Sequence, residues 1–208
     1  MYLWEGIVPK ASQISNPYTI TNINRLSNLY LYNLGYASTM ISFYMFPLMF
    51  LKKNIFQNIK NFFLKKINYI YIFTPFFYLY ILNLNYDFKS YVVDYYLMGF
   101  GFVHKISITF FDRLIHQKIF TYVSIIFSWW IICLVIEKKR DLLILMYFFL
   151  LSLLLIPLMQ EYFDPIILII SLLLFKIKIR FNYNNSLFIT MYFLFFLIAS
   201  NIYYLNAL

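Results

Sequence analysis

Long apolar segments that follow one another with short polar interruptions constrain this chain more than any other feature of its sequence. From residue 142 to residue 175 almost every position is apolar, apart from the stretch PLMQEYFDP at residues 157–165. Crossing the hydrocarbon core of a bilayer takes about 20 mainly apolar residues in a helix. A helix also satisfies its own backbone hydrogen bonds where no water is present. The sequence therefore predicts an all-α protein embedded in a membrane.

Six segments meet or approach this length, and together they predict a polytopic transmembrane helical bundle. They lie near residues 26–51, 67–84, 119–136, 142–158, 165–178 and 187–204. The fifth is short, with only about a dozen apolar residues before Lys176, so a tilt or a local thinning of the bilayer is expected there. Residues 1–25 form a polar outer segment, and residues 26–208 form the transmembrane domain.

Composition excludes a soluble domain. The chain is 63% hydrophobic and only 12% charged, which is far from the usual balance of a soluble protein. Its many Phe, Tyr, Asn and Lys residues are typical of an AT-rich genome, so they do not indicate a cofactor or a nucleic-acid partner. Cys133 is the single cysteine and forms no internal disulfide. No cofactor is predicted, and membrane lipids are the expected partners.

The connections between the six segments differ in charge, and this difference predicts orientation. If the chain crosses at each segment, residues 52–66, 137–141 and 176–180 share one side, which carries 11 basic and 2 acidic residues. The other side carries 6 basic and 6 acidic residues. Loops rich in Lys and Arg stay cytoplasmic, so the N-terminus is predicted to lie outside. A bacterial inner membrane is the predicted location, with an organelle membrane as the alternative.

Residues 87–118 are predicted to form an outer interfacial or re-entrant segment and not a further span. A crossing within residues 91–111 would put the later basic connections on the opposite side from the first. Asp94, His104 and Lys105 are costly in lipid and inexpensive at an interface. Gly99 and Gly101 permit a sharp bend or a close approach of two backbones.

The end of this segment, FDRLIHQK, holds the first group of candidate site residues. Asp112 and His116 are four residues apart and share one face if a helix forms there. Such a pair can hold a metal or orient an imidazole, and an ordinary interfacial helix presents it too. Arg113 and Lys118 suit a phosphate better than a divalent cation. The candidate phosphate or head-group contacts are therefore Lys105, Arg113, His116 and Lys118, and no metal site is predicted.

The stretch PLMQEYFDP holds the second group. The segments on either side predict a hairpin on the outer face, with residues 160–164 at its tip. Glu161 and Asp164 give this tip a negative charge beside Tyr162, at the depth of the aromatic belt. One interpretation is a solvated loop with aromatic anchors. The other is the rim of a pocket that binds a sugar through Gln160, Glu161, Tyr162 and Asp164.

This turn also resembles part of a known family. A Pro-Leu pair at the end of an apolar span, followed by a Glu-centred turn with Tyr, is similar to the C-terminal region of polytopic GT-C glycosyltransferases. The nearest likeness is to dolichyl-phosphoglucose-dependent α-1,2-glucosyltransferases, whose turn looks like P-L-x-E-x-R-Y. Pro157 and Leu158 match that turn, Glu161 is displaced by one position, Tyr162 follows it directly, and the Arg is missing. WEGIVPKASQ and FYMFPL look like internal pieces of such an enzyme.

The resemblance implies a function on the outer face. Such an enzyme moves a sugar from a polyprenyl-phosphate donor, and its catalytic acid lies in a large loop after the first transmembrane helix. The chain is therefore expected to be the C-terminal part of a longer protein, and the catalytic residue is unknown. The alternative is a non-catalytic membrane subunit of a larger complex. A transporter is disfavoured because the spans carry almost no ionisable residue at mid-membrane depth.

Overall fold

The computed structural model of the 208-residue chain describes residues 29–52, 54–85, 87–88, 100–136, 138–155, 158, 160, 163–164, 166–175 and 182–207. Helices account for 84% of this part of the chain, which contains no strand, and this confirms the predicted all-α fold. The elements are α4 (Tyr32–Phe50), α5 (Ile55–Leu64), η1 (Lys66–Asn68), α6 (Tyr69–Asn85), α8 (Gly101–Phe110), α9 (Leu114–Val135), α10 (Lys139–Ser152), α11 (Ile166–Leu173) and α12 (Tyr183–Ala207).

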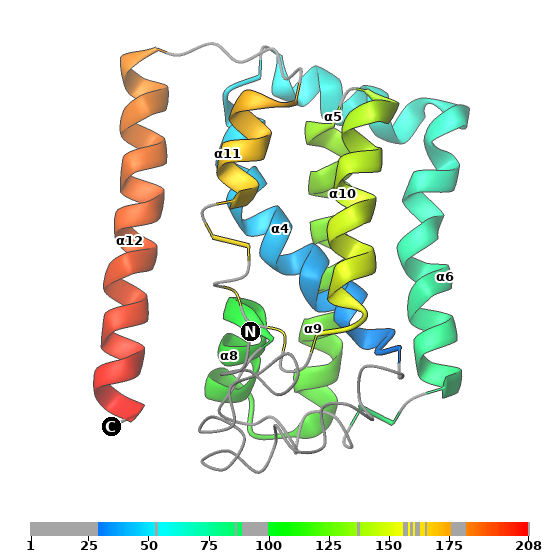
Figure 1. The fold of residues 1–208 in the computed structure, drawn as a ribbon, viewed down its shortest axis with the longest axis vertical. Helices are drawn as coiled ribbons and strands as arrows, with labels where there is room; N and C mark the ends of the chain where they lie inside the picture. Colours follow the sequence, from blue (N-terminus) through cyan, green and yellow to red (C-terminus); the bar gives the residue numbers. More distant parts are fainter. Residues whose placement is uncertain are drawn as a thin grey trace, which may run out of the picture.

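The helices form a bundle with two distinct ends. Helices α4, α6, α9, α10 and α12 extend between these ends, and α4 is inclined to its neighbours (Figure 1). Helix α5 lies across one end and turns by 74° into α6. Helix α8 lies at the opposite end, where α12 also finishes (Figure 1). These are called the α5 end and the α8 end below.

Fewer helices than predicted are independent candidates for spanning a membrane. Among the described residues, α9 and α12 are long and apolar enough, and the bent pair α5 and α6 is a third candidate if it counts as one span. Helix α10 has 14 residues and α11 has only 8. At 1.5 Å per residue, eight residues rise about 12 Å, which is well below the thickness of the hydrocarbon core. Membrane association is therefore supported, with two or three spans in place of six.

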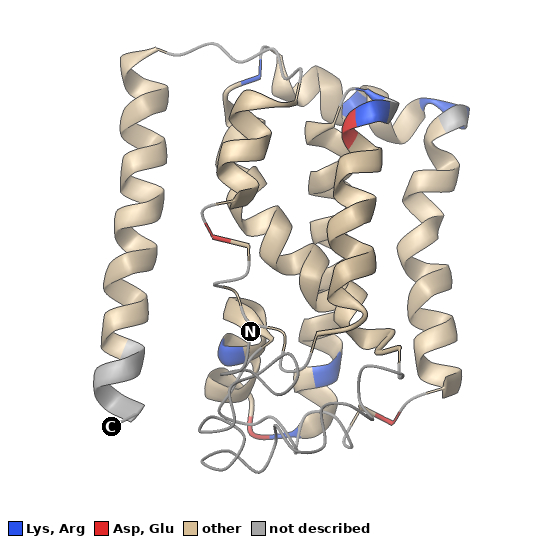
Figure 2. Ribbon diagram, viewed as in Figure 1, with Lys and Arg blue, Asp and Glu red and all other residues tan. Residues whose placement is uncertain are grey.

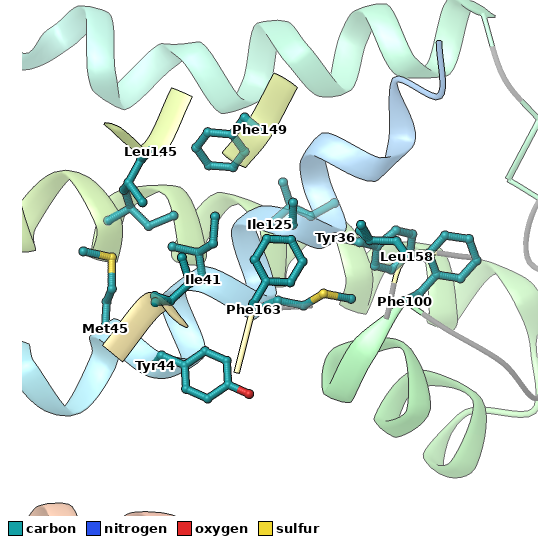
Figure 3. Close-up of a cluster of buried hydrophobic side chains, with 14 of the residues drawn as sticks. Tyr36, Ile41, Tyr44, Met45, Phe100, Ile125, Leu145, Phe149, Leu158 and Phe163 are labelled. Carbon is teal, nitrogen blue, oxygen red and sulfur yellow. The ribbon is translucent and has the colours of Figure 1, made fainter. Parts of the chain in front are cut away.

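Helix α4 forms the centre of the bundle and packs against α8, α9, α10, α11 and α12. Figure 3 shows its side chains Tyr36, Ile41 and Met45 among residues from the surrounding elements. The approach of α9 is close, because a Cβ atom added at Gly35 would lie 2.6 Å from Cδ1 of Ile125. In lipid the hydrophobic effect does not drive helices together. Small residues favour helix association there because they let two helices pack closely.

The buried hydroxyl groups of α4 are satisfied within the helix. The side chains of Ser38, Thr39 and Ser42 each donate a hydrogen bond to the carbonyl three residues earlier, over 2.6, 2.7 and 3.0 Å. These bonds let polar residues face the core without an unpaired donor. Helix α4 can therefore be buried at most of its positions while carrying several polar residues.

Two helices contain proline, and in each case a neighbouring helix supplies the missing donor. Proline has no N–H, so Pro47 leaves the carbonyl of Phe43 without its usual partner within α4. The hydroxyl group of Tyr192 on α12 donates a hydrogen bond to this carbonyl over 3.1 Å. The contact satisfies the proline site and attaches α12 to the bundle.

Pro75 produces the same arrangement in α6, with α9 as the donor. The carbonyl of Tyr71 loses its partner within the helix and accepts a bond from Nε1 of Trp129 over 3.1 Å. The adjacent carbonyl of Ile72 accepts a bond from Nε1 of Trp130 over 3.3 Å. The Trp129-Trp130 pair therefore joins α9 to α6 at the proline site.

Charged residues gather at the two ends (Figure 2). The connections that hold Lys52, Lys65 and Lys138 meet at the α5 end, so two of the three predicted basic connections do share one end. Residues 176–180, the third, lie outside the described residues. Between the ends the described ribbon is almost free of charge, with the exception of the acidic segment that leads into α11 (Figure 2).

Candidate functional site

Two described residues of the PLMQEYFDP stretch, Leu158 and Phe163, pack into the bundle. Leu158 is fully buried, and Phe163 is 2% exposed. Figure 3 shows Leu158 beside Phe100 and Tyr36. The backbone N–H of Phe100 donates to the carbonyl of Leu158 over 2.6 Å, which ties the stretch to the start of α8. The sequence analysis did not predict this packing, because it considered only the polar residues of the stretch, as a solvated loop or as the rim of a pocket.

Gln160 holds the N-terminus of α8. Its Oε1 accepts a hydrogen bond from the N–H of Phe102 over 2.9 Å, and its Nε2 lies 3.4 Å from the hydroxyl group of Tyr44 on α4. The first N–H groups of a helix have no partner within the helix. Gln160 therefore serves as a helix cap contributed from 58 residues away. Its carbonyl oxygen is already occupied, which weakens its predicted role as a direct sugar ligand.

The start of α8 requires glycine. Phe100 and Gly101 both have positive φ, at 57° and 70°, a conformation that favours glycine. A Cβ atom at Gly101 would also lie 2.8 Å from Cε of Met40 and 3.2 Å from Oε1 of Gln160. Gly101 thus takes the positive φ of a bend and lies closely against the side chains of Met40 and Gln160. Gly99 lies outside the described residues.

A cavity of about 190 Å³ opens beside Gln160. It is lined by residues of α4, α8, α9 and α12, including Ser42, Ser128 and Tyr192. Ligand pockets usually exceed 300 Å³, so this space suits a small group and not a whole disaccharide. Its described lining holds no Asp, Glu, His, Lys or Arg, and proton transfer by these residue types is therefore not available from it. The cavity can bind a group but lacks a general base of this kind.

The other predicted sugar contacts are placed differently. Asp164 is exposed and precedes α11. Glu161 and Tyr162 lie outside the described residues, so their predicted contacts have no described geometry. Of the four proposed sugar ligands, Gln160 is the one that lines the cavity.

The predicted phosphate contacts lie at the α8 end without converging on a described cavity. Lys105 is half-buried on α8, while Arg113 and His116 are exposed at the start of α9. The ammonium group of Lys118 lies 5.5 Å from the ring centroid of Tyr122. Helix α9 begins at Leu114, so Asp112 precedes it and does not form the expected helical pair with His116.

A buried polar cluster at the α8 end was not identified from the sequence. His104 is 1% exposed and packs edge-on against Tyr36 and Phe100, with ring centroids 5.7 and 5.2 Å away. Within the described residues, neither ring nitrogen of His104 has a hydrogen-bond partner, and the hydroxyl groups of Tyr36 and Thr121 also lack one. Burial, aided by the charge of Lys105, lowers the pKa of His104 from 6.5 to about 4. His104 is therefore neutral at neutral pH.

His104 was predicted only as a polar residue of the interfacial or re-entrant segment, and the structure shows that its side chain is buried within the protein. Gly101, His104 and Ser107 form the buried face of α8 and recur every three residues. Residues three apart lie on the same face of a helix, and here that face consists of small and polar side chains. A reading based on hydrophobic residues overlooks such a face, although the spacing was visible in the sequence.

Comparisons with known proteins found no relative of this chain. No protein-family model matches the chain, and no curated protein or solved structure matches it. The fold and the candidate sites therefore define a class, a helical bundle with features of a membrane protein. Function has to be argued from the geometry.

Proposed function

We propose that this chain is a multi-pass integral membrane protein whose candidate spans, α9, α12 and the bent pair α5 and α6, cross the bilayer. The observation that carries this proposal is the separation of charge to the two ends of a bundle with an apolar exterior. Its long helices expose large apolar side chains between these ends: Phe73, Phe77 and Tyr80 on α6, Val123 and Phe127 on α9, Tyr147 and Leu150 on α10, and Phe195 and Leu197 on α12. Lipid would cover this surface.

Cysteine labelling in intact cells tests the crossings. In a Cys133→Ser background, single cysteines replace Lys60 and Arg140 at the α5 end, and Asp87 and Arg113 on the predicted outer segment. A membrane-impermeant maleimide is expected to label positions 87 and 113, and to label positions 60 and 140 only after permeabilisation. Labelling of all four positions before permeabilisation would overturn the proposed topology.

For the activity, we propose transfer of a sugar from a polyprenyl-phosphate donor on the outer face, with this chain as one part of the enzyme. Support comes from the cations at the α8 end, Lys105, Arg113 and Lys118, which can stabilise a departing phosphate. The small cavity beside Gln160 gives room for part of a sugar near the same elements. A general base would come from a segment outside the described residues.

Charge-removing variants test this activity in the full-length protein. Glu161→Gln and Asp164→Asn are each assayed for transfer of radiolabelled glucose from polyprenyl-phosphate glucose, and Asp87→Asn serves as an exposed acidic control. A loss of at least tenfold in the first two variants, with the control unchanged, is expected if these carboxylates bind the sugar. Equal transfer in all three variants would overturn the proposed contacts.

A non-catalytic subunit is the second candidate, and α12 favours it. The membrane-length part of α12, Tyr183–Ile202, has no fully buried residue. In such a subunit another protein would cover this helix. Native gels of membranes solubilised in digitonin would then show one large complex that Leu194→Trp on α12 disrupts, whereas an independent enzyme would migrate unchanged.

A further inference from the structure

A second cavity lies at the α5 end, away from every site that the sequence predicts. Its volume is about 430 Å³, which is within the usual range for ligand pockets. Helix α5 lies across this end, and the ends of α4, α9 and α10 meet there (Figure 1). The cavity is lined by Lys52, Asn58, Asn61, Phe62, Lys65, Asn68, Tyr71, Cys133, Leu134, Ile136, Lys138 and Leu142.

The lining has one sign of charge. Three lysines, Lys52, Lys65 and Lys138, come from three different connections of the chain, and no described lining residue is acidic. Three asparagines add amide groups that can donate hydrogen bonds. Cations gathered around one cavity repel each other unless an anion lies between them. Ammonium and amide donors together fit the oxygens of a phosphate.

Local contacts fix part of this lining. The ammonium group of Lys52 donates a hydrogen bond to the carbonyl of Leu134 over 2.9 Å, at the end of α9. The amide of Asn68 donates to the carbonyl of Phe62 over 3.0 Å and braces the turn between α5 and α6. Lys65 and Lys138 are exposed at the rim, and Lys138 directly precedes α10. The N-terminus of α10 therefore lies at the rim, and its first turn contains the buried acid Asp141, whose carboxylate is 3.5 Å from Nε of Arg140.

The surroundings place the cavity at the depth of lipid head groups. Helix α5 carries exposed apolar side chains, including Phe56 at 86% and Leu64 at 64% exposure, beside its polar face. Such a helix lies in the plane of the membrane interface. Ile70, at the start of α6, is 70% exposed and continues the apolar surface toward the bundle. An acyl chain can lie against this surface while its head group occupies the cavity.

We propose that this cavity binds the phosphate of an anionic phospholipid head group from the leaflet at the α5 end. Free phosphate would use the same donors, so the shared chemistry is an anionic phosphate oxygen held by lysine and asparagine. The site shares no lining residue with the cavity beside Gln160 and does not depend on the proposed sugar contacts. It gives the bundle a fixed anchor in an anionic leaflet.

Two double variants of equal charge test the proposal. Lys65→Gln with Lys138→Gln removes two cations from the rim, and Lys60→Gln with Lys66→Gln removes two exposed cations from the same end that do not line the cavity. Binding of phosphatidylglycerol and of phosphatidylcholine to the full chain in neutral detergent is measured by native mass spectrometry. We expect the Kd for phosphatidylglycerol to rise about tenfold or more in the rim variant and less than about twofold in the control.

The outcomes separate the possible sources of the anion. In the unchanged protein, displacement of phosphatidylglycerol by millimolar inorganic phosphate assigns the site to phosphate alone, and retention assigns it to the lipid. Equal weakening in both double variants, or equal binding of the two lipids, overturns the proposal. Circular dichroism monitors folding, and Asn61→Leu decides the matter if the rim variant does not fold. This variant removes an amide donor without changing the charge, and unchanged binding in it would count against the site.

Discussion

Helices α4 and α12 are both long and mainly apolar, yet they occupy opposite environments. Helix α4 buries most of its residues, including Gly35, Ser38 and Ser42, and packs against helices on several sides. Helix α12 has no residue in its spanning part that is fully buried. Of the two, α12 is the one whose composition qualifies it as a candidate span. In this bundle the core is formed by the helix that does not qualify as a candidate span.

The difference follows from what drives packing in lipid. Lipid tails are as apolar as Leu, so an apolar side chain gains little by moving from lipid into a helix interface. Small residues and paired hydroxyl groups gain close contact and hydrogen bonds instead. Hydropathy therefore identifies helices that face lipid more readily than the helix around which they assemble.

The sharpest contrast between the two helices comes from truncating one apolar side chain on each. Ile41 on α4 is fully buried, and Ile41→Ala is expected to lower the free energy of unfolding by about 3 kcal/mol through the cavity it leaves. Phe195 on α12 is 73% exposed, and Phe195→Ala should cost about 0.5 kcal/mol or less. Denaturant titration in mixed micelles measures both, and equal losses would remove the distinction between core and periphery.

Two asparagines, one on each helix, give the next largest difference in stability. The amide of Asn33 on α4 donates to the carbonyls of Ser152 and Leu155, over 2.9 and 2.6 Å, where α10 ends. Asn33→Leu leaves these buried carbonyls short of a donor and should cost about 2 kcal/mol. Asn201 on α12 bonds only within its own helix in the described contacts, to Leu197. Asn201→Leu should therefore be almost neutral in the same titration, and a comparable loss would contradict this account.

Much of the fold was predictable from the long apolar segments and from the charges of the connections between them. They identified a helical membrane-type protein and the shared end of residues 52–66 and 137–141. The number of spans was overestimated because apolar composition does not show where a helix ends. The described part of the fifth predicted segment forms only Ile166–Leu173 as helix.

The candidate sites were less predictable, because tertiary contacts decide them. Gln160 was chosen as a sugar ligand, but its partner Phe102 is remote in sequence, and no local pattern indicates that capping bond. The burial of His104 was not predicted, although its three-residue spacing from Gly101 and Ser107 was available in the sequence. The cavity at the α5 end combines lysines that sequence reading used for topology alone.

The docking of α8 on α4 should depend on pH. The pKa of His104 is about 4 in the folded protein and 6.5 when unfolded, so below pH 6.5 the unfolded state takes up a proton that the folded state does not. Between pH 7 and 5.5 this should lower the free energy of unfolding by about 1 kcal/mol. His104→Gln should remove that part of the pH dependence, while His116→Gln, at an exposed position, should retain it. Parallel pH profiles for both variants would contradict the assignment.

The smallest predicted effect concerns the bond that joins the two compared helices. Tyr192→Phe removes the donor to the carbonyl of Phe43, and the expected loss is about 0.5–1 kcal/mol because that carbonyl has no partner within α4. Pro47→Ala restores an N–H that can bond to the same carbonyl, so Tyr192→Phe should cost almost nothing in a Pro47→Ala background. Unfolding titrations of the four proteins complete a double-mutant cycle. An equal cost of Tyr192→Phe in both backgrounds would show that α12 is not attached to α4 through the proline site.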